Sequence, residues 1–193
     1  MKKISVAPAF WLILLGTLMI GLHKKYMLLF CAASVHELGH GLAIWISDAK
    51  IEQIRLIPGG LDIRYCEKHF SYAADLLIAL AGPAANLLFA MLISSADLQG
   101  TDLFIGLNLT LCFFNLLPIY PLDGGKILCT IMTFFSPAEG EKAFFLLSGT
   151  LAALLFAAAC GACFYRLRAI WSVLIFGYIF LQQNLQMLCK EAI

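Results

Sequence analysis

The sequence predicts an all-α membrane protein with six transmembrane helices and one small β-hairpin between the second and third helices. Of its 193 residues, 62% are hydrophobic and only 13% are Asp, Glu, Lys or Arg, which is roughly half the charged fraction of an ordinary soluble domain. The charged residues also gather between long apolar stretches instead of alternating with apolar residues. These features are typical of a membrane protein and exclude a water-soluble fold. Because the stretches take up most of the chain, we expect residues 1–193 to form a single domain.

Six stretches are long enough to cross a bilayer, because a hydrocarbon core of about 30 Å needs about 20 helical residues. The first follows Met1-Lys2-Lys3 as a signal peptide would, but no small-residue cleavage site follows it, so we expect an uncleaved helix. The second carries Glu37 as its only full charge, and each of the other five contains a charge-free run of 19 to 23 residues. The predicted helices span about residues 4–22, 26–47, 72–96, 101–120, 143–165 and 169–189.

The polar stretch between the second and third predicted helices has the pattern of a hairpin. Ile54–Ile57 and Leu61–Tyr65 flank the turn sequence Pro58-Gly59-Gly60, and apolar residues alternate with Asp62 and Arg64 in the second segment. Two roles remain open for this predicted hairpin. It could simply link two helices, or it could offer an edge strand to an extended peptide.

The distribution of Lys and Arg predicts the orientation of the chain in the membrane. With both termini in the cytoplasm, nine Lys and Arg residues lie on the cytoplasmic side and four on the other, which is the asymmetry that membrane proteins favour. We therefore expect a multi-pass protein of a bacterial cytoplasmic membrane, with both termini cytoplasmic and the lipid bilayer as its surroundings. A net charge of +1 gives no reason to expect nucleic acid as a partner.

The second predicted helix contains the residues with the clearest chemical signature. His36 and His40 are four residues apart, so both imidazoles project from one helix face and can bind one metal ion, and Glu37 can reach a water at that ion. The composition of the chain gives roughly 0.003 chance matches to this pattern. Ionisable groups are also costly inside a membrane, so they need partners or a wet cavity. The pattern predicts a metal centre more strongly than a His-Glu cluster that only bonds neighbouring helices.

A catalytic zinc ion usually has three protein ligands, so a third one is needed. Asp123 is favoured because two prolines and two glycines in residues 115–125 break the helix beside it. Broken backbone at membrane depth is tolerated only where protein or a water-filled cavity surrounds it. The predicted second and fourth helices also run in the same direction, which brings Asp123 to the side of His40. The candidates for the third ligand are Glu52, Glu67, His69, Asp75 and Asp123.

Together these motifs resemble the site-2 protease family of intramembrane zinc metalloproteases. The resemblance covers roughly residues 30–130 and includes the predicted second, third and fourth helices, which are similar to the three-helix catalytic core of that family. Outside this range only the helix count matches, and six helices resemble the sporulation-factor branch. The matching motifs are His36-Glu37-Leu38-Gly39-His40, Gly82-Pro83-x-x-Asn86 and Asn115-x-x-Pro118-x-x-Pro121-Leu122-Asp123-Gly124.

The resemblance implies one Zn²⁺ per chain with His36, His40 and Asp123 as its ligands and Glu37 as the general base. It also implies hydrolysis of a peptide bond within or next to a transmembrane segment of a membrane protein substrate, under the control of a membrane inhibitor or regulator. We further hypothesise that Asn86 or Asn115 bonds the unwound substrate or the developing oxyanion. The alternative is that both amides satisfy broken backbone near Pro83 and Pro118.

Two other functions stay open at this point. One is a membrane zinc protease of the prenyl-protein type, in which Glu67 would complete the metal site. The other is a non-catalytic metal-binding membrane scaffold. The Cys160-Gly-Ala-Cys163 pattern lies inside a predicted helix with no second cysteine pair, so we interpret it as small residues for helix packing.

Overall fold

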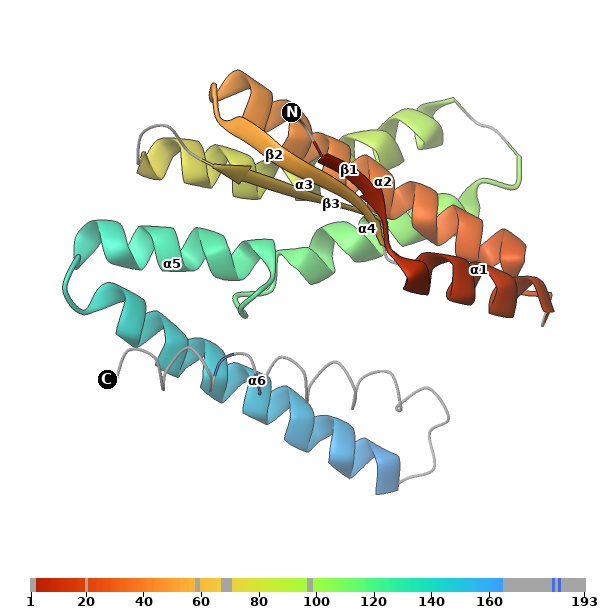
Figure 1. The fold of residues 1–193 in the computed structure, drawn as a ribbon. Coiled ribbons are helices and arrows are strands. Elements are labelled where there is room, and N and C mark those ends of the chain that lie inside the picture. The colour runs from red at the N-terminus through yellow and green to blue at the C-terminus, as the bar shows by residue number, and fades with distance from the viewer. Residues whose placement is uncertain are drawn as a thin grey trace. The chain divides into compact units, whose positions relative to one another are not determined.

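The fold is described from a computed structural model that covers residues 3–19, 21–57, 60–66, 71–96, 99–164, 182 and 184. The chain divides into two compact units, Met1–Asn115 and Leu116–Ile193, and each is described by itself. Figure 1 shows that helices dominate the described residues, with one small sheet formed near the N-terminus. The prediction of a single domain stays a prediction.

The sheet of the first unit has three strands in the order β1-β2-β3. Strand β1 (Lys3–Val6) runs parallel to β2 (Lys50–Ile57), and β2 runs antiparallel to β3 (Gly60–Cys66). The backbone N–H of Ala7 extends the pairing by donating to the Leu56 carbonyl at 2.8 Å. The connection between β2 and β3 passes through residues 58 and 59, which lie outside the described residues.

The first helix begins later than predicted. Helix α1 spans Pro8–Met19, so the prediction of a helix from residue 4 is wrong at its start. The first residues of that stretch include the β-branched Ile4 and Val6, which suit a strand, and they pair with β2. Proline then occupies the first helical position, where its fixed φ angle suits the start of a helix.

The described part of the first unit has three further helices. Two of them have bounds close to those predicted for the second and third spans. Helix α2 (His23–Ile46) packs against α3 (Tyr72–Ser95) and α4 (Asp102–Asn115), and α3 also packs against α4. A Cβ added at Gly39 would lie only 2.4 Å from the Ala81 carbonyl oxygen. Glycine is therefore required for the close approach of α2 and α3, as is common between membrane helices.

The second unit begins with an irregular segment, residues 116–122, followed by α5 (Asp123–Phe135) and α6 (Gly140–Phe164). A helix was predicted to continue from 101 to 120, but α4 ends at Asn115 and no helix was predicted at α5. The structure corrects both points. The two prolines of the segment, Pro118 and Pro121, cannot continue a regular helix. Buried Ile119, Leu122 and Ala152 form the hydrophobic cluster that joins the segment to α6.

The described helices include three that are long and apolar enough to cross a membrane, namely His23–Ile46, Tyr72–Ser95 and Gly140–Ala158. The prediction of six transmembrane helices is thus supported only in this coarser form. Helix α4 has 14 residues, fewer than the roughly 20 of a full span, and the predicted helix at 169–189 lies outside the described residues except for 182 and 184. Large apolar side chains such as Trp45, Leu88 and Leu92 are 74%, 61% and 65% exposed, as expected for surfaces that contact lipid.

Candidate metal centre

His36 and His40 lie one turn apart on α2, and their imidazoles face each other. The two side chains are buried, with 6% and 8% exposed, and their Nε2 atoms are 3.2 Å apart. The ring centroids are 4.7 Å apart and the ring planes are nearly perpendicular, at 87°. The spacing of four residues on a helix therefore brings the two rings together, as the sequence predicted.

The backbone of α3 fixes which nitrogen of His40 is available for a ligand. His40 Nδ1 lies 2.7 Å from the Ile78 carbonyl oxygen. Because a carbonyl can only accept a hydrogen bond, Nδ1 carries the proton and donates it, which leaves the lone pair on Nε2. A metal-binding histidine almost always donates its other N–H in this way, and the bond fixes both its tautomer and its ring orientation.

The distance between the two Nε2 atoms fits a shared zinc ion. Two nitrogen ligands about 2.0–2.1 Å from a tetrahedral zinc ion lie about 3.3 Å apart, and the structure has 3.2 Å. Imidazole nitrogens and a carboxylate oxygen are also the donor set that catalytic zinc sites use. The histidine pair thus matches the metal that the sequence predicts, both in geometry and in the chemistry of its donors.

Gly82 of α3 makes room for the imidazoles. A Cβ at this position would lie 2.4 Å from His40 Nε2 and 2.8 Å from His36 Cε1, which is closer than real Cβ contacts. The next residue, Pro83, lies inside α3 and has no N–H to donate to the helix. The Gly82-Pro83 motif is visible in the sequence, but its contact with the histidines is not, because a glycine carries no sign of what it lies against.

Asp123 is the first residue of α5 and is only 3% exposed. Its Oδ1 accepts a hydrogen bond from Lys126 Nζ at 3.0 Å. The next residue, Gly124, lies so close to the preceding segment that its Cβ would be 2.2 Å from the Leu116 carbonyl oxygen. The double glycine after Asp123 therefore lets the broken segment fold back tightly onto the start of α5.

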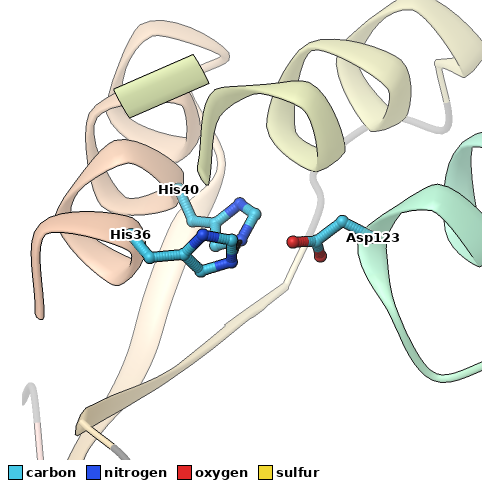
Figure 2. A group of neighbouring side chains, drawn as sticks. All are labelled: His36, His40 and Asp123. Carbon is cyan, nitrogen blue, oxygen red and sulfur yellow. Dashed lines mark hydrogen bonds between the residues drawn. The ribbon is translucent and has the colours of Figure 1, made fainter. Parts of the chain in front are cut away.

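His36 and His40 of the first unit and Asp123 of the second are all buried, and each carries a side-chain atom that can bind a metal ion. Figure 2 shows the two imidazoles on one helix and the Asp123 carboxylate at the start of another. Asp75, a rival for the third ligand, lies in the first turn of α3 and is outside this group. The other rivals cannot be placed, because the Glu52 side chain and residues Glu67 and His69 lie outside what the structure describes.

The remaining predicted site residues differ in their surroundings. Glu37 follows His36 on α2 and is partly buried. Asn86 lies one turn after Gly82 on α3 and is 0% exposed, and neither its Oδ1 nor its Nδ2 has a hydrogen-bond partner among the described residues. Asn115 ends α4 and donates from Nδ2 to the Leu111 carbonyl at 3.0 Å. Asn86 is therefore a buried amide that can bond another group, whereas the Asn115 amide already bonds its own helix.

Comparison with known proteins finds a matching family model and similar proteins. Residues 97–158 match Peptidase family M50, a range that includes Asn115 and Asp123. The chain is 37% identical over 135 residues to stage IV sporulation protein FB of Bacillus subtilis, covering 65% of this chain and 46% of that protein. It is 32% identical over 117 residues to a zinc metalloprotease of Methanocaldococcus jannaschii, covering 56% of this chain and 34% of that protein.

A solved structure extends the likeness to the fold. The chain resembles the site-2 protease from Methanocaldococcus jannaschii with a TM-score of 0.68 and 26% sequence identity, over 95% of this chain and 90% of that one. By contrast, the matches to the curated relatives span less than half of their length, 46% and 34%.

Proposed function

Because the predicted resemblance to the site-2 protease family is confirmed by both sequence and structure, we propose that this chain is an intramembrane zinc metalloprotease of that type. Its reaction is the hydrolysis of a peptide bond within or next to a transmembrane segment of a membrane protein. The observation that carries this proposal is the buried pair His36 and His40, with facing Nε2 atoms 3.2 Å apart, directly beside the carboxylic acid Glu37.

One zinc ion per chain is proposed, held by His36, His40 and Asp123. Support for the first two ligands comes from the Nε2 separation and from the Ile78 carbonyl, which holds the proton on His40 Nδ1 and leaves the Nε2 lone pair for a metal ion. Support for Asp123 comes from its burial as a carboxylate and from its place in the Pro-Leu-Asp-Gly motif that resembles the family. When bound, zinc supplies a Lewis acid that polarises the scissile carbonyl and lowers the pKa of water.

Glu37 is proposed as the general base and then the general acid. It takes a proton from the attacking water and returns it to the leaving amine. A peptide bond inside a helix is shielded by its own hydrogen bonds, so the substrate must unwind before it is attacked. We propose that Asn86 bonds the unwound backbone or the developing oxyanion, and its unbonded buried amide supports this role. Asn115 is the second candidate, with its amide nitrogen already engaged by Leu111.

The surroundings of the protein follow from the same proposal. Three described helices that are long and apolar enough to cross a membrane support a multi-pass membrane protein. We propose that it lies in a bacterial cytoplasmic membrane, with both termini cytoplasmic as the charge distribution predicts. The likeness to stage IV sporulation protein FB supports a role in sporulation, with a membrane protein substrate and a membrane inhibitor or regulator as partners.

The variant Glu37→Gln tests the proposed reaction. The purified variant should bind one zinc ion per chain as the wild type does, because the imidazoles are unchanged, and its cleavage rate should fall by about 10²–10⁴-fold. Cells that carry the wild type or Glu37→Gln are then compared by mass spectrometry of their membrane proteins, and shortened single-span fragments should appear only with the wild type. Glu139→Gln is the matched control, since Glu139 is exposed on the turn before α6.

The alternatives make different predictions in the same experiments. A metal-binding scaffold would give identical membrane protein fragments with the wild type and with Glu37→Gln. A prenyl-protein type of protease would lose its zinc in Glu67→Gln and keep it in Asp123→Asn. Either result would overturn the proposal.

A further inference from the structure

Buried side chains from elsewhere in the second unit bond both backbone polar groups of Tyr120. The Tyr120 backbone N–H donates to Ser148 Oγ at 2.8 Å, and the Tyr120 carbonyl accepts from Asn184 Nδ2 at 3.0 Å. Ser148 and Asn184 are both 0% exposed, and they follow Tyr120 by 28 and 64 residues. The broken segment has no helical ladder here, so its backbone takes its partners from two distant parts of the chain.

One face of α6 packs against this segment. Ser148 and Ala152 are four residues apart and therefore lie on the same side of the helix. Ala152 packs against Ile119 and Leu122 on either side of Tyr120. The ring of Phe145 meets the Tyr120 ring edge to face, with the centroids 5.4 Å apart. The hydroxyl of Ser148 thus belongs to a fully buried side chain within an apolar contact.

The backbone between Tyr120 and Asp123 is folded too tightly to absorb a shift. The Leu122 N–H donates to the Ile119 carbonyl at 2.8 Å. A Cβ at Gly125 would lie 2.5 Å from the same carbonyl oxygen, so the first turn of α5 rests directly on the segment. These contacts connect the residues on either side of the Tyr120 peptide to the first turn of α5, which begins at Asp123.

We propose that Ser148 and Asn184 are positioning residues for Asp123, which they orient for metal binding by clamping the Tyr120 peptide from both sides. The inference rests on the proposed function, in which Asp123 is a zinc ligand. Neither side chain touches the reacting atoms. Groups that orient a metal ligand typically account for a 10–100-fold difference in metal affinity, and the clamp acts on the ligand through its backbone.

The clamp is tested by measuring the zinc affinity of Ser148→Ala in competition with a chromophoric chelator. We expect this variant to bind zinc about 10–100-fold more weakly than the wild type. Thr150→Ala is the matched control, because Thr150 lies two residues along α6, is exposed, and bonds the Leu147 carbonyl of its own helix. Asn184→Ala removes the other side of the clamp and carries the test by itself if Ser148→Ala does not fold.

Two further measurements separate positioning from a general structural role. The visible spectrum of the Co²⁺-substituted protein reports the geometry around the ion, and in Ser148→Ala it should shift toward that of Asp123→Asn, while Thr150→Ala keeps the wild-type spectrum. In the Asp123→Asn background, Ser148→Ala should cause no additional loss of zinc affinity, since the ligand that it positions is already gone.

The outcomes distinguish this inference from the function on which it rests. A wild-type protein that binds no zinc overturns both. A wild type that binds zinc, together with Ser148→Ala or Asn184→Ala variants that match Thr150→Ala within twofold, overturns the inference alone. If Ser148→Ala lowers zinc affinity equally in the wild type and in Asp123→Asn, the inference is also overturned.

Discussion

Replacing Gly82 with alanine is expected to weaken zinc binding more than it weakens the fold. The added methyl group would lie 2.4 Å from His40 Nε2, where an ordinary contact begins at 3.4 Å, so the ring and the methyl group must separate by about 1 Å. His40 cannot make this movement and keep its 2.7 Å hydrogen bond to the Ile78 carbonyl. The substitution thus disturbs a proposed ligand and the group that orients it.

The expected magnitude follows from the loss of that hydrogen bond. Losing the partner of a metal-binding histidine costs about 10–100-fold in metal affinity, which is about 1.4–2.8 kcal/mol. Overpacking costs about 1–3 kcal/mol of folding stability, but alanine recovers up to about 1 kcal/mol because it is the better helix former. The loss of zinc affinity should therefore exceed what the change in thermal stability of the metal-free protein accounts for.

Chelator competition on the purified protein in detergent measures the zinc affinity, and the melting temperature of the metal-free form measures the fold. Gly106→Ala is the matched control, because a Cβ at Gly106 in α4 has no atom within 4 Å. If Gly82→Ala binds zinc within twofold of Gly106→Ala, then His40 is not seated against Gly82 and the reasoning is refuted.

Three other perturbations give sharp expectations. Lys126→Met removes the ammonium group that pairs with the buried Asp123 carboxylate, so zinc should bind more tightly than in the wild type and should raise the melting temperature more. The gain in zinc affinity should be less than tenfold, because Lys126 is half exposed. A smaller rise in melting temperature than in the wild type would contradict this. Asn86→Leu removes a buried amide without partners, so stability should hold or improve while cleavage slows; unchanged cleavage would exclude a role for Asn86 in catalysis. Removal of the metal with a chelator should abolish cleavage, and Zn²⁺ but not Mg²⁺ should restore it, because Mg²⁺ prefers oxygen ligands; rescue by Mg²⁺ would argue against a zinc site.

The sequence predicts the helices that depend only on local composition. Helices α2 and α3 lie close to the predicted spans, because each is an apolar run that ends at polar residues. Strand β1 was not predicted, because its pairing partner lies about 50 residues further along the chain and a short apolar segment looks the same in a strand or a helix. Helix α5 was missed because Lys126 and two glycines interrupt its apolar pattern.

The candidate site was predictable only in part for a similar reason. His36, Glu37 and His40 form a pattern on one helix, and Asp123 stands beside a visible break in the chain. The groups that orient these residues have no such signature. A backbone carbonyl at Ile78 and a single serine at position 148 become meaningful only when distant segments are brought together.

The parallel pairing of β1 with β2 constrains the order in which the protein is assembled. Lys3 pairs with Gln53, so β1 must wait for a partner that is translated only after α1 and α2. Contacts of such long sequence separation form late because the intervening loop must first close. We therefore expect nascent chains arrested shortly after residue 46 to expose β1 to added protease. Chains arrested well beyond residue 57 should protect β1.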